Sequence, residues 1–173
     1  LAAGTLSMTA CSSLPGGVNR SQIDTDSRQA LNDLYARNAA AKAVGQQARA
    51  VLIFPNIVKG GLGLGGAYGT GEMRRGGQVV DYYSTFTGSW GLQAGAQSYG
   101  YAVFLMNDDA VKYVEDSEGW EIGVGPTVVL VNAGVAQNLS TTSLQDDAYA
   151  FIFDQKGLMA GISIEGTKIN KLD

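Results

Sequence analysis

Glycine constrains the fold of this chain more than any other residue type. Twenty of its 24 glycines lie at or beyond Gly60, whereas the whole chain of 173 residues holds three prolines. Glycine adopts backbone conformations that other residues avoid and lets two backbones approach closely, and it lowers helix stability by about 1 kcal/mol relative to alanine. A glycine-rich region with few prolines and no low-complexity repetition therefore predicts β-structure with tight turns, and not disorder, beyond residue 60.

Short apolar runs separated by turn residues extend this pattern along the chain. A buried strand is expected over residues 50–54, where Pro55 stops it. Further strands are expected over 62–73, 79–86, 91–98, 101–106, 120–124, 127–131, 148–153 and 158–164, with a turn at Gly76-Gly77. Asn107 is expected to cap a short helix that ends at Glu115. Many short strands without a repeat of fixed period predict a curved antiparallel sheet or a partly closed barrel.

The region before these strands has helical spacing. Apolar side chains recur at intervals of three and four between residues 24 and 49, and Asp26 or Ser27 could cap the first turn. Asn38 offers a second start before an alanine-rich stretch, so two short helices with a break there are expected. Their thin, alanine-rich apolar face predicts close packing on a sheet. The expected fold class is α+β, with N-terminal helices packed on a strongly curved, glycine-rich antiparallel sheet or partly closed barrel.

Charge and composition exclude several functions. The net charge of −4 and the pI near 4.7 argue against nucleic-acid binding, which needs a basic surface. Since the chain has no histidine, Ser-His-Asp and Cys-His catalytic arrangements are impossible. Residues 61–66 contain a G-x-G-x-x-G pattern, but glycine alternation continues after it where a nucleotide-binding motif would require a helix. We therefore expect no nucleic acid and no nucleotide as a ligand.

The remaining candidates for catalysis are two acidic pairs, Asp108/Asp109 and Asp146/Asp147. They could in principle serve a carboxylate mechanism or bind Ca²⁺, but each lies beside an expected turn or helix start, where aspartate is common as a cap. We expect no enzymatic activity, no catalytic residue, no metal and no cofactor. Six aromatic residues are interpreted as core and turn residues in preference to ligand platforms: Tyr82, Tyr83, Trp90, Tyr99, Tyr101 and Trp120.

The N-terminal residues are typical of a processed leader. Residues 1–10 are small or apolar and uncharged, as expected of the remnant of a signal peptide. Met8-Thr9-Ala10-Cys11 is similar to a bacterial lipobox, with methionine in place of the usual leucine. Cys11 is the sole cysteine of the chain, so it has no disulfide partner within it, and lipidation would consume its thiol. Cys11 is the expected lipidation site, carrying palmitate or a similar acyl chain.

Domain organisation and localisation follow from this interpretation. Residues 11–23 would be the lipidated cysteine with a flexible tether, and residues 24–173 a single domain. No later stretch has the 18 or more uninterrupted apolar residues of a transmembrane helix. The expected location is the bacterial cell envelope, lipid-anchored on the periplasmic side. Ser12 after the cysteine favours the outer membrane over the inner one.

The charge of the chain divides near Gly60. Residues 12–59 carry six basic and three acidic residues, and residues 60–173 carry six basic and thirteen acidic ones. A basic helical N-terminal segment followed by an acidic β region could orient the protein at an anionic surface. The alternative is an ordinary solvated face of the helices.

Four glycine-rich segments together resemble the signature of the SYLF domain family. They are IFPNIVKGG (53–61), GGAYGTG (65–71), GLQAGAQS (91–98) and KGLMAGISIEGTKI (156–169). Their order and spacing extend the resemblance over roughly residues 27–171. The Tyr82-Tyr83 variant and the absence of a second domain are similar to the bacterial branch of the family, whose members are often lipoproteins.

The resemblance implies a membrane-lipid partner. Eukaryotic relatives bind phosphoinositide membranes, with basic residues of the N-terminal amphipathic helix contributing. For a bacterial relative this carries over as a preference for anionic lipid. The lipid-binding residues that correspond by position are Arg28, Arg37, Lys42, Arg49 and Lys59. The alternative function is an envelope scaffold or assembly protein that binds another protein through its sheet edge or exposed aromatic residues.

Overall fold

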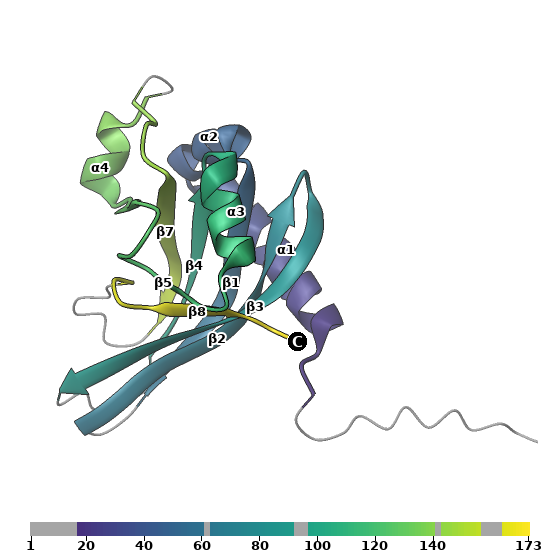
Figure 1. Ribbon diagram of the computed structural model, residues 1–173. Coiled ribbons are helices and arrows are strands. Elements are labelled where there is room, and N and C mark those ends of the chain that lie inside the picture. The colour runs from purple at the N-terminus through teal and green to yellow at the C-terminus, as the bar shows by residue number, and fades with distance from the viewer. Residues whose placement is uncertain (1–16, 61–62, 92–96, 141–142, 157–163) are drawn as a thin grey trace, which may run out of the picture.

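The computed structural model describes residues 17–60, 63–91, 97–140, 143–156 and 164–173, and it confirms the expected α+β class. In these residues four helices surround one eight-stranded sheet that curls into a half-barrel (Figure 1). The helices are α1 (Arg20–Arg37), α2 (Ala39–Gln47), α3 (Asp108–Asp116) and α4 (Ala133–Asn138). The strands are β1 (Ala50–Gly60), β2 (Gly63–Arg75), β3 (Gln78–Gly91), β4 (Gln97–Leu105), β5 (Trp120–Glu121), β6 (Val128–Leu130), β7 (Ala148–Lys156) and β8 (Lys168–Lys171).

The strand order is β5-β8-β3-β2-β1-β4-β7-β6. All neighbours are antiparallel except β6 and β7, which are parallel, so the sheet is mixed at one edge. No helix in the described ranges is long and apolar enough to span a bilayer.

The break between the two N-terminal helices falls at Asn38, as expected. The backbone N–H of Asn38 donates to Leu34 at the end of α1, and its side chain accepts a hydrogen bond from Ala41 N at the start of α2. The expected start of α1 is wrong. The helix begins at Arg20 with Asn19 as its cap, and Ser27 is fully buried inside it. Polar residues before residue 24 concealed this first turn, because they face solvent and carry no apolar period.

The expected end of the first strand at Pro55 is also wrong, because β1 continues to Gly60. The register with β2 shifts between Ile53 and Asn56, and the register with β4 shifts between Phe54 and Ile57. Pro55 thus lies in a β-bulge, where a residue without an N–H does not interrupt the hydrogen-bond ladder.

Other strands differ in their lengths. The expected strand over 120–124 ends at Glu121, since Gly123 and Gly125 turn the chain at positive φ. β8 and α4 were not expected, and β8 holds one buried apolar residue, Ile169, among four. Most of the expected strands over 91–98 and 158–164 lie outside the described residues.

The turn at Gly76-Gly77 is confirmed and joins β2 to β3. Both glycines have positive φ, 60° and 79°, which is the geometry of a two-residue hairpin turn with a right-handed twist. Gly71 in β2 has a different role. A Cβ atom there would overlap the carbonyl oxygen of Ile53 in the bulged part of β1, so glycine allows the two strands to approach.

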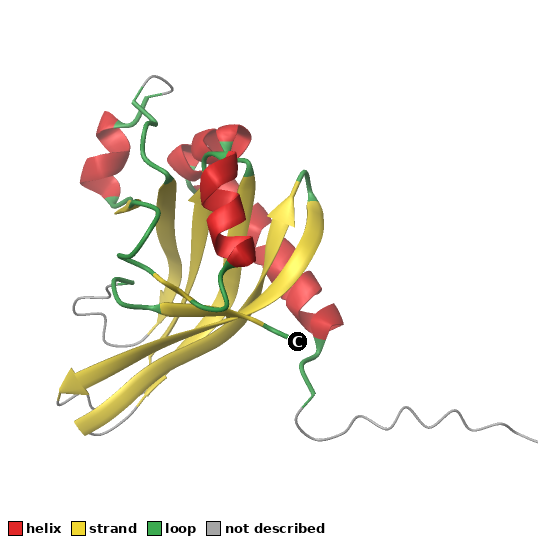
Figure 2. Cartoon of the chain, in the orientation of Figure 1, coloured by secondary structure: helices red, strands yellow, loops and turns green. Residues whose placement is uncertain are grey.

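The sheet has a buried core on each face, with α3 on one and α1 and α2 on the other (Figure 2). β4 shows this alternation: Tyr101, Val103 and Leu105 belong to the α3 cluster, and Ala102 and Phe104 belong to the α1 cluster. All five side chains are at most 1% exposed, which confirms the expectation of a strand buried on both faces.

Candidate functional site

The face of the sheet on which α1 packs, called the α1 face below, is the best-defined surface of the domain. Alternate residues of a strand point to the same face. Val51 and Ile53 pack against the N-terminal helices, and their partners on β2 are Arg74 and Glu72. The α1 face of β2 therefore carries Tyr68, Thr70, Glu72 and Arg74. α1 covers the middle of this row and leaves its two ends accessible.

A pocket of about 460 Å³ lies on one side of α1, between α1, α2 and the Gly76-Gly77 turn. Three arginines from separate elements line it. Arg28 comes from α1, Arg49 from the segment before β1, and Arg74 from β2. We call this the arginine pocket. Leu31, Tyr35 and Ala48 add apolar surface to its wall.

The three guanidinium groups are held differently. Arg74 is the fixed one: its side chain is 13% exposed, it pairs with Glu72, it lies 3.7 Å from an Asp24 oxygen, and it donates to Gly77 O at 3.3 Å. Arg28 and Arg49 are exposed, and in the described ranges neither side chain forms an ion pair. Two of the three cations are thus available to an anion from outside.

Glu72 lies beneath α1, beside this pocket, and is fully buried. Its pKa is raised to about 7: burial is the largest cause and a hydrogen bond that a protonated Glu72 would share with Asp24 also raises the pKa, whereas Arg74 lowers it. Among the described residues, neither Glu72 Oε2 nor Asp24 Oδ1 has a hydrogen-bond partner. A proton shared between the two carboxyls would satisfy both atoms.

The expected lipid-binding residues are partly brought together. Arg28 and Arg49 meet at the arginine pocket. Arg37 is separate and pairs with Asp154 at 3.4 Å, and Lys42 is exposed on α2. Lys59 lies in the outer part of β1, beyond the bulge, opposite Ala67. Cys11 lies outside the described residues.

Arg74 was missed by the sequence reasoning. It belongs to the Arg74-Arg75 pair before the hairpin turn, where two adjacent basic residues suggest a solvated strand end. The available signal for Arg74 was the alternation of side chains along the strand. It turns Arg74 toward α1 and Arg75 to the other face, where Arg75 lies 3.2 Å from Asp108.

The acidic pairs have structural roles. Asp108 and Asp109 occupy the first turn of α3, whose cap is Asn107 as expected, and carboxylates there favour the positive end of the helix dipole. Asp147 accepts hydrogen bonds from Thr127 and Asn107, which lower the pKa of its carboxyl. The described residues contain no group of three or more potential metal-ligating side chains.

Most of the aromatic residues form the core, as interpreted from the sequence. Tyr83, Tyr99, Tyr101 and Trp120 are buried, and burial raises the pKa of the three tyrosines. Tyr82 is half-buried, and the guanidinium of Arg20 lies 5.2 Å from its ring centre. The Trp90 side chain lies outside the described part of the structure.

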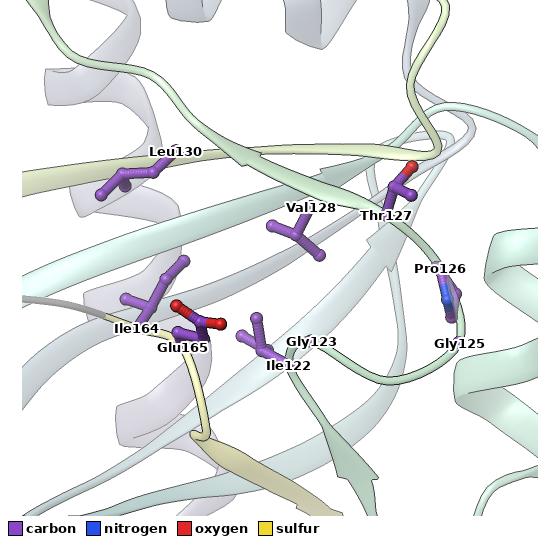
Figure 3. A pocket seen from close by; sticks show the side chains of 9 residues that line it. All are labelled: Ile122, Gly123, Gly125, Pro126, Thr127, Val128, Leu130, Ile164 and Glu165. Atoms are coloured by element: carbon purple, nitrogen blue, oxygen red, sulfur yellow. The ribbon is translucent and has the colours of Figure 1, made fainter.

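A second pocket of about 450 Å³ lies where the two edges of the curled sheet face each other (Figure 3). Its lining comes from the loop after β5, from β6 and from the segment before β8: Ile122, Gly123, Gly125, Pro126, Thr127, Val128, Leu130, Ile164 and Glu165. Glu165 is the sole charged residue in this lining. The described residues thus bring no cation for an anionic ligand and no second carboxylate for acid–base chemistry to this pocket, and the arginine pocket is the stronger candidate.

The comparison with known protein families gives a match. Residues 86–173 match the model of the family described as Ysc84, Las17-binding protein actin regulator, over just more than half of the chain. This is the SYLF domain family that the glycine-rich segments resemble. No curated protein gives a significant match. The matched segment begins within β3, so Arg28, Arg49 and Arg74 precede it.

Proposed function

The chain belongs to the Ysc84 family, the family of the SYLF domain, and from this membership we propose that it is a non-enzymatic lipid-binding module that holds an anionic headgroup at the arginine pocket. The observation that carries the proposal is the convergence of Arg28, Arg49 and Arg74 from three separate elements on one pocket. A planar guanidinium donates two parallel hydrogen bonds to a phosphate, so three of them provide a strong phosphate site.

The proposal includes attachment through Cys11 in a bacterial envelope, with the outer membrane as the more suitable location. A single acyl chain gives marginal anchoring, whereas the three chains of a bacterial lipoprotein would make the attachment stable. The arginine pocket would add a contact that selects the anionic surface. Its exposed cations attract anionic lipid over about 8 Å at physiological salt, so binding should weaken as salt rises.

Liposome flotation of the full chain carrying Cys11→Ser tests headgroup binding without the acyl anchor. We expect the protein to float with phosphatidylglycerol vesicles at low salt and to stay unbound with phosphatidylcholine alone. The double variant R28Q/R49Q should lose most of this binding. The matched control R75Q/K112Q removes the same charge on the α3 side of the sheet, where Arg75 reaches Asp108, and should bind as before. Equal loss in both double variants would refute the pocket and leave a general charge effect.

Palmitate labelling in a bacterial host tests the anchor separately. Label should enter the unaltered chain and disappear in Cys11→Ala. Label that persists in Cys11→Ala would overturn the lipidation site and would leave the arginine pocket untouched.

An envelope scaffold that binds another protein is the second candidate, because the family description names a Las17-binding protein. Two results together would favour it: no flotation with any vesicle, and a stoichiometric partner recovered after crosslinking in the envelope.

A further inference from the structure

We propose that the outer part of the α1 face, on the side of α1 opposite the arginine pocket, is a surface that inserts into the interfacial region of a bilayer. It consists of Val58, Tyr68 and Phe86, called the outer stripe. The inference rests on the proposed membrane attachment, and it adds a second contact that does not depend on the arginines.

The outer stripe is continuous and exposed. Val58 on β1 pairs with Tyr68 on β2, and Tyr68 pairs with Phe86 on β3. Directly opposed residues of antiparallel strands have Cβ atoms about 5 Å apart, so the three side chains form one apolar row. They are 52%, 53% and 50% exposed, although each is a large apolar residue beside a well-packed core.

Glycines border the outer side of the stripe. On its outer side the next residues of the same face are Gly60, Gly66 and Gly88, which are themselves register partners. The Phe86 ring leans over the neighbouring strand β2, where its edge is 3.0 Å from the position that a Cβ atom of Gly66 would take. Glycines here leave a shelf without side chains, on which an apolar layer could rest.

The inner neighbours are polar but uncharged, namely Asn56, Thr70 and Ser84. Lys168, the partner of Phe86 on β8, ends the row with an exposed cation. Tyrosine, phenylalanine and a lysine that extends its amine toward headgroups are the side chains that membrane interfaces accommodate.

The position of the stripe agrees with the proposed anchor. Asn56 and Thr70 line a pocket of about 260 Å³ together with Val18 and Asn19, so the start of α1 lies beside the stripe. Val18 is itself 45% exposed. Val18 follows Cys11 by seven positions, and an extended chain of that length reaches about 25 Å. A bilayer that holds Cys11 is therefore within reach of the outer stripe.

A cysteine-free background makes a direct test possible, because Cys11 is the sole cysteine. The test uses the mature chain, residues 12–173, with a hexahistidine tag at position 11 that binds nickel-chelating lipid in neutral phosphatidylcholine vesicles. The tag replaces the acyl anchor, so the result does not depend on headgroup binding. An environment-sensitive fluorophore is attached to Phe86→Cys or, as control, to Tyr113→Cys on the α3 side of the sheet.

We expect the label at position 86 to brighten on tethering and to be quenched by brominated acyl chains, and the label at position 113 to do neither. In untagged protein on phosphatidylglycerol vesicles, Y68S/F86S should lower affinity by about tenfold. The matched control Y113S/V124S replaces two residues of similar exposure away from the stripe and should leave affinity unchanged.

Three results would overturn the inference. The first is a label at position 86 that neither brightens nor is quenched on tethered vesicles, even if untagged protein binds anionic vesicles through the arginines. The second is a stripe covered by another copy of the chain, seen as a dimer that Y68S/F86S converts to monomer. The third is a label that is shielded by a crosslinked envelope protein while bilayer lipid leaves it unquenched. If untagged protein does not bind phosphatidylglycerol vesicles but the label at position 86 is quenched on tethered vesicles, the arginine pocket is refuted and the stripe is supported.

Discussion

Replacing Glu72 with glutamine should make the protein more stable at alkaline pH. Glu72 is fully buried under α1, where its carboxyl lies between Arg74 and Asp24. Burial and the shared proton raise its pKa to about 7, whereas the same group in the unfolded chain titrates near 4.5. Glutamine has nearly the same shape as a protonated glutamate, can accept from Arg74 and donate to Asp24, and never ionises.

The sign and size of the effect follow from proton linkage. Between pH 4.5 and 7 the folded chain keeps a proton that the unfolded chain has released, so the free energy of unfolding falls as pH rises through this range. The difference between the two pKa values corresponds to about 3 kcal/mol. The unaltered protein should therefore lose up to about 3 kcal/mol between pH 4.5 and 8 on account of this group.

Urea denaturation of both proteins at intervals between pH 4.5 and 8 measures this loss. We expect Glu72→Gln to match the unaltered protein at pH 4.5 and to exceed it progressively above pH 5.5. Glu118→Gln, at an exposed position, controls for the loss of one negative charge and should leave the pH profile unchanged. If Glu72→Gln lowers stability at pH 8, the buried acid is stabilised as an anion, and if the two profiles run parallel, folding does not shift its pKa; either result refutes the reasoning.

Three further outcomes follow from specific side-chain contacts. Asn107→Ala removes the side chain that accepts from Ala110 N at 2.8 Å and donates to Asp147 at 2.9 Å, and it should cost about 2 kcal/mol in urea denaturation, without a change of fold by circular dichroism. Gly71→Ala should cost about 2 kcal/mol or more, because the methyl group meets a β1 carbonyl, whereas Gly60→Ala has open space and should cost well under 1 kcal/mol. Asp147→Asn should destabilise the protein at neutral pH, and the deficit should shrink as pH falls below 4, since the lowered pKa of Asp147 makes its stabilisation a property of the anion.

The local signals in the sequence predicted a large part of the fold. Asn38 divides the helices, Asn107 caps α3, and the Gly76-Gly77 hairpin forms, because each depends on side chains within a few residues of one another. Residues 101–105 are buried on both faces for the same reason: an uninterrupted apolar run has no polar face to expose.

Features that depend on pairing between distant strands were not predictable in this way. Pro55 indicates a strand end in any local window, and only the simultaneous register shifts with β2 and β4 place it in a bulge. β8 is a strand because Ile169 fills a position beside Trp120 and Thr85, and its own four residues carry little signal.

The candidate site shows the same limit. Arg28 and Arg49 were chosen as basic residues of the helical region, and their meeting at one pocket depends on how α1 crosses the sheet. Glu72 and Arg74 belong to a charged segment between Gly71 and Gly76 that is typical of a solvated strand end. The alternation along β2 turns both toward α1, and the helix then buries the carboxylate completely.

Arg74 links the buried acid to the proposed lipid site, because it pairs with Glu72 and lines the arginine pocket. When Glu72 is protonated, its ion pair with the Arg74 guanidinium weakens, and the net charge in and beside the pocket rises by one unit. An anion in the pocket should therefore bind more tightly at pH 6 than at pH 8, and by reciprocity it should raise the pKa of Glu72. Glu72→Gln should abolish this pH dependence and keep the tighter binding at both values. Flotation with phosphatidylglycerol vesicles at the two pH values would show the coupling, and equal pH dependence in Glu72→Gln would assign it to another group.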